Sequence, residues 1–429
     1  MMAMKGSNNK WRELFITNFL GVFNDNFLKN SIIFISVAWS LPAWLSQSQL
    51  ISLVASCLVV PYLIFSPIGG SLAVKYSKLK VLRLLKLIEI PVMLLACVAF
   101  YKQWVLLAVL SVFALGTQSC LYSPSKYSLI RDIGGEDGVS YGSGMFETMA
   151  FMGILIGTFI ASLISDHYSL LLFASIGIGV AFLGYYFSKI IRAEELPVEM
   201  SGSSTINPYK FVKSNYKFAG KFKLVNSAVY GSSAFWLIAN MVQMNIIIHC
   251  KGYYHISNSL TGVVMACAAV GIAFGTGITG KIMGTRVLKG LIIPALIGII
   301  TVLLVIVFIP LSFTAFIVMI ILFAFTAGMF QVPCMALMQQ ADLGRKRGDT
   351  VAYLNMMNFV FILIGTLVFS VTTALTGENS FAVFGVMIVL CLFILIYFLV
   401  RYPDFRNETA VLLKKMNNII RYTIRNFSN

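Results

Sequence analysis

The segment GVFNDNFLKN places charged and amide side chains in the middle of an otherwise apolar stretch. Asp25 and Lys29 are four residues apart, and Asn24, Asn26 and Asn30 lie beside them. An ionisable group in the core of a bilayer is costly unless it is paired or faces a wet cavity. Two interpretations are open. Asp25 and Lys29 neutralise each other on one helix face, or Asp25 faces a central cavity and binds a substrate cation or a proton.

A second segment, LYSPSKYSLIRD, brings a lysine between two phenols. Pro124 is expected to stop or kink a helix near one membrane surface. Lys126 then stands between Tyr122 and Tyr127, an arrangement that suits a phosphate or a carboxylate at the membrane interface. The alternative is an ordinary basic loop residue flanked by interfacial tyrosines.

A third segment, GSGMFETMAFMGILIGT, carries one acidic residue among glycines. Gly144, Gly153 and Gly157 allow close helix packing. Glu147 lies about two turns into the expected helix. It is a candidate for a salt-bridge gate, a proton carrier or a substrate contact, and a structural pair with an arginine of a loop is an equal alternative.

Composition places these segments in a membrane. Of the 429 residues, 59% are apolar and 11% are charged, and the mean hydropathy is +0.87. A soluble domain averages nearer ~25% charged residues. The net charge of +16 comes from short basic runs between apolar stretches, which favours a topology signal over nucleic-acid binding.

Enzyme motifs and metal-site spacings are absent from the sequence. It contains no phosphate-binding glycine loop, no HExxH and no GxSxG, so we expect no catalytic residues and no enzyme activity. The seven cysteines have no CxxC spacing, and the three histidines have no Cys/His cluster near them. We therefore expect no metal and no cofactor.

Twelve apolar stretches are long enough to cross the hydrocarbon core as helices, which takes about 20 residues each. They run over 14–40, 49–74, 81–100, 104–122, 142–165, 168–189, 224–248, 257–282, 287–309, 312–339, 350–375 and 379–401. Because the stretches are continuously apolar rather than alternating, a membrane barrel is excluded. The expected class is an all-α membrane protein.

Basic residues fix the expected orientation. One set of connections carries Lys5, Lys10 and Arg12, Lys75, Lys78, Lys80 and Arg83, Lys126 and Arg131, Lys210, Lys213, Lys217, Lys221 and Lys223, Lys281, Arg286 and Lys289, and Arg345, Lys346 and Arg347. The opposite set holds only Lys102 and Lys251. The asymmetry predicts that both termini are cytoplasmic in a bacterial inner membrane.

An internal repeat divides the chain. GILIGT at 153–158 recurs as FILIGT at 361–366, and the same offset of 208 residues pairs Glu147 with Asn355. Two parallel six-helix repeats describe the major facilitator architecture. The expected parts are an N-terminal six-helix bundle (14–190), a cytoplasmic linker (191–223), a C-terminal six-helix bundle (224–401) and a basic tail (402–429) that is either an amphipathic helix on the membrane surface or partly disordered.

Together, FNDN, LYSPSKYSLIRDI and MFET…GILIGT resemble the bacterial lysophospholipid transporter family of the major facilitator superfamily. That family reads FGDN, YSPAKYGIL and a helix-5 Glu ten residues before a Gly. The matching positions here are Asp25 and Asn26, Tyr122, Pro124, Lys126 and Tyr127, and Glu147 and Gly157. Two departures leave a shifted substrate open. Lys29 adds a charge beside Asp25, and Val74 stands where the superfamily's loop motif after Gly70 has Asp, which puts the usual charge latch in doubt.

The resemblance implies a flippase that returns lysophospholipids, chiefly lysophosphatidylethanolamine, to the cytoplasmic leaflet. An acyltransferase/acyl-ACP synthetase would then re-acylate them, here as a separate protein because the chain ends at Asn429. Asp25 would pair with the headgroup ammonium and Lys126 with the phosphate. Asn26, Tyr122, Tyr127 and Glu147 complete the expected substrate-binding set.

Two other functions fit the same sequence. One is a proton-coupled exporter of amphipathic drugs or metabolites, with Asp25 or Glu147 as the proton carrier. The other is a lipid-binding scaffold that anchors a partner enzyme without transport. A neighbouring acyltransferase gene would favour lipid recycling, and a neighbouring drug regulator would favour efflux.

Overall fold

The computed structural model describes residues 10–36, 39, 41, 47–166, 169–195, 207–412 and 414, and these residues form helices and connections without a β-strand. The helices are α1 (Arg12–Ile35), α2 (Gln47–Lys75), α3 (Lys78–Lys102), α4 (Val105–Asp166), α5 (Leu170–Ile190), α6 (Pro208–Ala219), α7 (Val225–Gly252), α8 (Asn258–Met283), α9 (Ile292–Phe308), α10 (Phe313–Gln340), α11 (Arg347–Thr376) and α12 (Ser380–Arg401). Short 3-10 turns, Lys289–Leu291 and Gly344–Lys346, precede α9 and α11.

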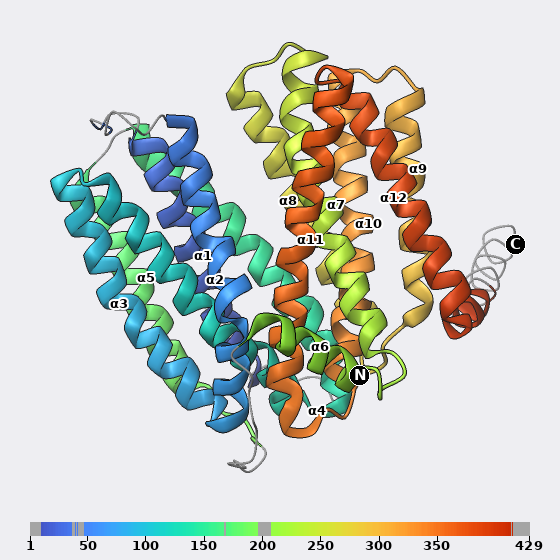
Figure 1. Ribbon diagram of the computed structural model, residues 1–429, viewed down its shortest axis with the longest axis horizontal. Coiled ribbons are helices and arrows are strands. Elements are labelled where there is room, and N and C mark those ends of the chain that lie inside the picture. The colour runs from blue at the N-terminus through green and yellow to red at the C-terminus, as the bar shows by residue number, and fades with distance from the viewer. Residues whose placement is uncertain are drawn as a thin grey trace, which may run out of the picture.

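The helices form two bundles that lie side by side. Figure 1 shows α1, α2, α3 and α5 in one bundle and α7 to α12 in the other. In the described part of the chain, nine helices are long and apolar enough to cross a membrane, and α4 counts as one of them although it covers two of the expected spans. The expected all-α membrane fold of two halves is confirmed, and the number of twelve spans stays a prediction.

Helix α4 differs from the expectation of two helices joined by a basic loop. Two helices, one that begins at Val105 and one that ends at Asp166, meet without an intervening loop at Gly135, where φ is 62° and ψ is −161° and the backbone is not helical. A Cβ built on Gly142 would lie 3.0 Å from Ile130, although a straight helix would separate these positions by ~18 Å. The first helix therefore passes through Pro124, and the chain reverses into the second helix at Gly135, where glycine tolerates the positive φ.

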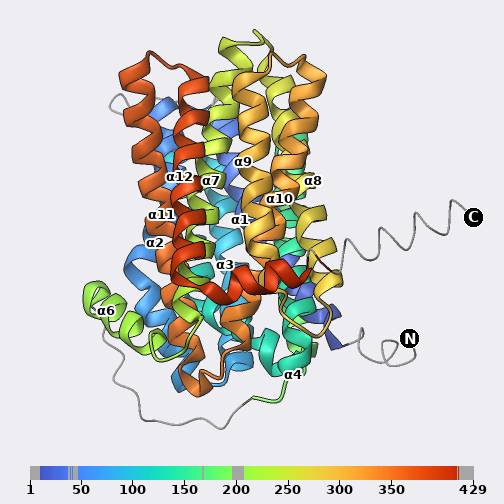
Figure 2. The ribbon, with the colours of Figure 1, turned by 90° about the vertical axis from the view of Figure 1, so that its right-hand side faces the viewer.

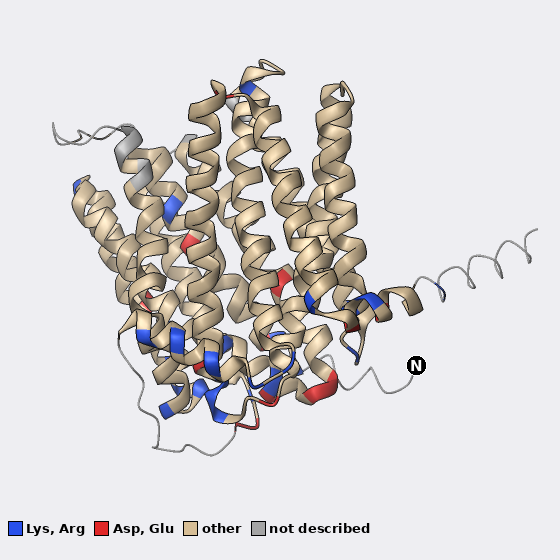
Figure 3. Ribbon diagram, turned by 45° about the vertical axis from the view of Figure 1, so that its right-hand side comes forward, with Lys and Arg blue, Asp and Glu red and all other residues tan. Residues whose placement is uncertain are grey.

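The two bundles meet at the end of the molecule where most lysines and arginines gather, which we call the basic end (Figure 3). There α4 packs against α8, α10 and α11, and α2 packs against α11. The backbones approach closely at Gly144 and Gly280, where a Cβ on Gly144 would lie 2.5 Å from Cα of Gly280. At the opposite end the ribbons of the two bundles separate (Figure 1).

The sequence repeat corresponds to a repeated contact. Thr158, the last residue of GILIGT, accepts a hydrogen bond from Asn30 of α1 at 2.9 Å. Thr366, the last residue of FILIGT, accepts one from Asn240 of α7 at 2.9 Å. The same helix pair is therefore tied by the same side-chain types in each bundle, which supports a duplicated architecture.

The expected linker contains a helix that the sequence pattern had not indicated. Helix α6 contacts α2 and α11 at the basic end. Figure 2 shows α6 on the outer side of the bundles. Residues 196–206 of the expected linker, and residues 413 and 415–429 of the expected amphipathic tail, lie outside the described residues.

Candidate functional site

Asp25 is half-buried in α1 and is held by a neutral partner. The Ser119 hydroxyl of α4 donates to both of its carboxylate oxygens at 2.9 Å. The Lys29 ammonium donates instead to Oδ1 of Asn26 at 3.1 Å. Within residues 10–36, no ion pair joins Asp25 to Lys29, although the two charges attract each other over a longer distance. The interpretation in which they neutralise each other by direct contact is therefore not realised.

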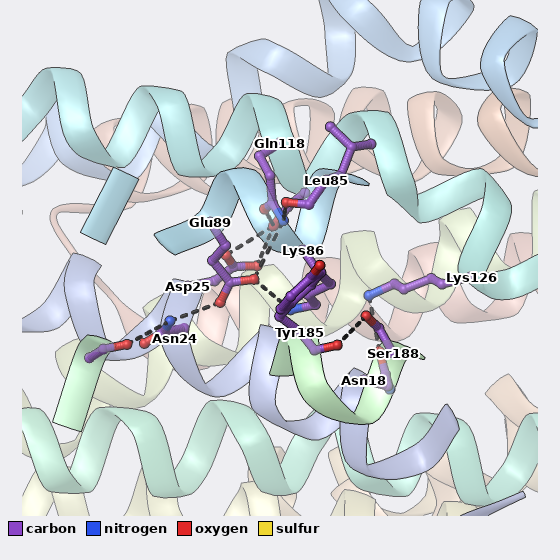
Figure 4. Close-up of polar contacts among 12 residues, drawn as sticks. Asn18, Asn24, Asp25, Leu85, Lys86, Glu89, Gln118, Lys126, Tyr185 and Ser188 are labelled. Carbon is purple, nitrogen blue, oxygen red and sulfur yellow. Dashed lines mark hydrogen bonds and ion pairs between the residues drawn. The ribbon is translucent and has the colours of Figure 1, made fainter. Parts of the chain in front are cut away.

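A buried ion pair in α3 escaped the sequence analysis. Lys86 Nζ lies 2.6 Å from Oε2 of Glu89, and both side chains are almost fully buried. Asn24 of α1 donates to the other oxygen, Oε1, at 2.8 Å, and Gln118 of α4 approaches Oε2 at 3.4 Å (Figure 4). A signal was present in the sequence, because Lys86 and Glu89 lie within the apolar run 81–100 just as Asp25 lies within 14–40.

Lys126 lies in a helix and not in an interfacial loop. Lys126 is only 7% exposed, and its ammonium donates to Oδ1 of Asn18 at 3.0 Å. The ammonium lies 5.0 Å from the ring centroid of Tyr122 and 5.5 Å from that of Tyr127, with Phe146 at 5.7 Å. Aromatic faces stabilise a cation at such distances. The expected flanking by two tyrosines is therefore present, inside the bundle.

Glu147 is 2% exposed in the second half of α4. The Tyr127 hydroxyl donates to its Oε1 at 3.3 Å. One of the alternatives, a structural pair with a loop arginine, does not occur among the described residues. Tyr127 therefore links the two charges, since its ring faces the Lys126 ammonium and its hydroxyl binds the Glu147 carboxylate.

These groups act on one another electrostatically. Asp25 experiences the charges of Glu89, Lys86 and Lys126. Lys126 in turn experiences the charge of Glu147. With Lys29, the cluster contains three cations and three anions and is neutral as a whole. Isolated buried charges are far more costly than compensated ones, so this balance makes the cluster tolerable.

Five of the six expected site residues lie in this cluster: Asp25 on α1, and Tyr122, Lys126, Tyr127 and Glu147 on α4. The sixth, Asn26, makes its hydrogen bonds within α1, accepting from Lys29 and donating to the carbonyl of Val22 at 2.9 Å. The sequence analysis missed Asn18, Lys86, Glu89, Gln118 and Ser119. Asn18, Gln118 and Ser119 are neutral and had no signal of their own.

The cluster borders the junction with the second bundle. Asn355, the repeat partner of Glu147, donates to the Ser123 hydroxyl of α4 at 2.9 Å. Tyr62 of α2 stacks on Phe359 of α11 with ring centroids 4.2 Å apart. A movement of one bundle relative to the other would therefore change the surroundings of the charged cluster.

Charged groups close the basic end. Asp132 of α4 pairs with Lys78 of its own bundle and lies 3.9 Å from a guanidinium nitrogen of Arg347 on α11. The position of the missing latch residue, Val74, is buried and apolar. Asp349 of α11, in the opposite bundle, places its carboxylate against Gly70 of α2. There is room for this carboxylate because glycine has no side chain. Among the described residues no ion pair joins Asp349 to a cation, so the doubt raised by Val74 about the charge latch stays.

Two helical bundles that meet at one end, with a charge-balanced cluster inside the first, are typical of secondary membrane transporters. Comparison with known proteins identifies the class. The sequence model of the Major Facilitator Superfamily matches residues 14–366, and the chain belongs to that superfamily.

Curated relatives are lysophospholipid transporters. The protein of that name from Pectobacterium carotovorum is 23% identical over 364 residues, which cover 82% of this chain and 84% of the relative. The one from Photorhabdus laumondii is 22% identical over 383 residues, which cover 85% of this chain and 91% of the relative. The resemblance first drawn from three short motifs therefore extends over most of the chain.

Solved structures share the fold. The Escherichia coli fucose:proton symporter FucP superposes with a TM-score of 0.72 over 92% of this chain and 99% of that one, at 13% identity. The human organic anion transporter MFSD10 gives a TM-score of 0.70 over 90% of this chain and 99% of that one, also at 13% identity. At such identities the likeness concerns the fold alone.

Proposed function

We propose that the protein is a lysophospholipid transporter that moves lysophosphatidylethanolamine to the cytoplasmic leaflet. The carrying observation is the presence of Asp25 and Lys126 in one buried cluster with no direct counter-ion on either among the described residues. The name of the relatives supports the same substrate class.

Lys86 and Lys126 differ in how their charges are compensated. Lys86 contacts a carboxylate directly, at 2.6 Å. Lys126 contacts the amide oxygen of Asn18 and aromatic rings, none of which carries a full negative charge. A phosphate would offer Lys126 a charge-assisted hydrogen bond that its present partners do not offer. Lys126 is therefore preferred to Lys86 as the phosphate ligand.

Glu89 and Asp25 differ in the same way. Glu89 is bound by Lys86, whereas Asp25 receives the neutral Ser119 hydroxyl. An ammonium group that reached Asp25 would form an ion pair in surroundings of low dielectric constant. Binding one cation and one anion together leaves the cluster neutral, which matches a zwitterionic ethanolamine headgroup.

The orientation completes the proposal. If lysines and arginines mark the cytoplasmic side, the basic end faces the cytoplasm of a bacterial inner membrane, and both termini lie there. The contacts between bundles at that end then describe a state closed to the cytoplasm. Rocking of one bundle against the other would open the basic end and release the lipid inward, where a separate acyltransferase/acyl-ACP synthetase would consume it.

Uptake into proteoliposomes tests the proposal. Labelled lysophosphatidylethanolamine should become inaccessible to an external lipid-binding protein when the transporter is present. The same assay with an ionophore reports whether a gradient drives the movement. Proton-driven movement of amphipathic drugs without lipid movement would establish the exporter instead. Saturable lipid binding without transfer would establish a scaffold.

A further inference from the structure

Helix α6 presents an unusually basic surface. From Asn207 to Lys223 the chain contains five lysines and no acidic residue. Lys210, Lys213 and Lys217 follow a spacing of three and four, which places them on one helix face. All three are exposed. Within the described residues, these three lysines form no ion pair. Lys223, which lies beyond the end of the helix, pairs with Asp404 at 2.6 Å.

The opposite face fixes this helix to the bundles. Phe211, Asn215 and Ala219 are buried at successive turns. The ring of Phe218 lies 4.9 Å from the ammonium of Lys346, just before α11. Since α6 contacts both α2 and α11, it cannot turn its lysines inward without losing these contacts.

Helix α6 also lies at the level of the ends of the spans, where lipid headgroups border a membrane protein. Figures 1 and 2 show α6 running across the spans at the basic end and on the outer side of the bundles. Tyr209 and Tyr216 are 73% and 47% exposed beside the lysines. Tyrosine and lysine together are typical of helices at the level of lipid headgroups.

We propose that the lysine face of α6 binds the headgroups of anionic phospholipids in the leaflet that borders the basic end. The ligand is a membrane lipid and is distinct from the transported molecule, so this site does not depend on the proposed transport function. An acidic protein would also match the charge. The position of α6 beside the spans and the exposed tyrosines favour lipid, because a protein partner would have to share that level with the headgroups.

The test uses the full-length protein in a neutral detergent, titrated with phosphatidylglycerol or with phosphatidylcholine. A ligand that binds the folded protein raises its Tm in proportion to the logarithm of ligand concentration above Kd. Wild type should be stabilised by phosphatidylglycerol and not by phosphatidylcholine. Each surface lysine contributes ~1 kcal/mol, and about 1.4 kcal/mol corresponds to a factor of ten, so the triple variant Lys210→Gln, Lys213→Gln, Lys217→Gln should need roughly a hundredfold more lipid.

A matched control removes the same charge elsewhere. Lys80→Gln, Lys281→Gln and Arg286→Gln remove three exposed cations from the same end without touching α6. This control should respond to phosphatidylglycerol as wild type does, and the arginine variant Lys210→Arg, Lys213→Arg, Lys217→Arg should too. An unchanged response of the α6 glutamine variant, or an equal loss in the control, would overturn the proposal. Retained lipid response together with loss of binding to an acidic protein would assign the surface to that protein.

If the glutamine variant has a lowered Tm without lipid, its Tm shift no longer measures lipid binding alone. The arginine variant and the number of phosphatidylglycerol adducts in native mass spectrometry then test whether the lysine face binds lipid. Equal numbers of adducts on the glutamine variant and on wild type would contradict the proposed lipid site. Fewer adducts on the glutamine variant alone would support it. Salt provides a final check, because binding through exposed lysines should weaken as ionic strength rises.

Discussion

Ser119 donates to both carboxylate oxygens of Asp25, at 2.9 Å each, and so ties α4 to α1 through a neutral group. A hydroxyl stabilises a carboxylate without cancelling its charge. The lysine one turn away, Lys29, bonds to Asn26. Asp25 is therefore stabilised but not neutralised by its contacts, a condition suited to receiving a cation.

Asp25→Asn should impair transport of lysophosphatidylethanolamine more than that of anionic lysophosphatidylglycerol. The first headgroup carries an ammonium that loses its ion-pair partner, and the second does not. A charge-assisted hydrogen bond contributes about 1.5–3 kcal/mol, which corresponds to roughly a ten- to hundredfold loss. Uptake of both lipids by the variant, reconstituted at equal density, measures the difference. Wild-type transport of both lipids would remove Asp25 from the site.

A double change separates the remaining explanations for Asp25. Since Lys29 makes no direct contact with Asp25 in residues 10–36, Asp25→Asn combined with Lys29→Leu should not restore transport. Recovery in the double variant would show that the two residues serve only to neutralise each other. If Asp25 carries a proton, the single variant should instead lose the dependence of uptake on a pH gradient.

Lys126→Ala should weaken transport of both lipids, because each contains a phosphate. Lys126→Arg should retain more activity than Lys126→Ala, since it keeps the charge near Asn18 and the rings of Tyr122 and Tyr127. The expected loss for alanine is again about ten- to hundredfold. The measurement is the initial uptake rate against lipid concentration. Normal rates in both variants would reduce Lys126 to a structural cation.

The pair of Lys86 and Glu89 should prove structural. Removing one partner of a buried ion pair costs about 3–5 kcal/mol, because the other charge is left unpaired. Lys86→Met should therefore lower the Tm in detergent strongly, and Lys86→Met with Glu89→Met should recover much of the loss. Equal destabilisation by the single and double changes would mean that the two charges do not depend on each other.

Hydropathy was enough to predict the membrane fold, but it was not enough to place the charged cluster. Lys126 was assigned to a loop because Pro124 and the following polar residues interrupt the apolar pattern. In the structure the helix continues to Gly135, and the surrounding helices shield the polar residues from lipid. A sequence pattern records polarity but not whether lipid or protein surrounds it.

The partners of the charged groups set a second limit. Glu89 could have been found by the rule that identified Asp25, since both are charges in apolar runs. Asn18 and Ser119 could not, because neutral polar residues are common in membrane helices and their partners depend on how the helices pack. The cluster becomes visible only when α1, α3 and α4 are brought together.

Topology can be checked at the connection between the halves. A cysteine introduced at Gly202, which lies outside the described residues, should react with a membrane-impermeant thiol reagent only when the cytoplasmic side is accessible. The lysines of the same connection give the physical reason. Labelling from the periplasm of intact cells would reverse the orientation and with it the direction of transport that we propose.

The contact between the two bundles at the basic end requires glycines where α4 and α8 cross. A Cβ on Gly144 would lie 2.5 Å from Cα of Gly280, closer than backbone atoms can yield without shifting a helix. Gly144→Leu should therefore hold the bundles apart at the basic end and stop the transport cycle. A cysteine placed at Ser123, whose hydroxyl contacts Asn355 across the junction, should then be labelled more strongly by a thiol reagent.

Gly179→Leu provides the matched control, because a Cβ there meets no atom within 4 Å among the described residues. It should transport lipid and label as wild type does. Normal transport by Gly144→Leu would show that the cycle does not require this close approach, and loss of transport in both variants would point to a general effect of leucine rather than to the crossing.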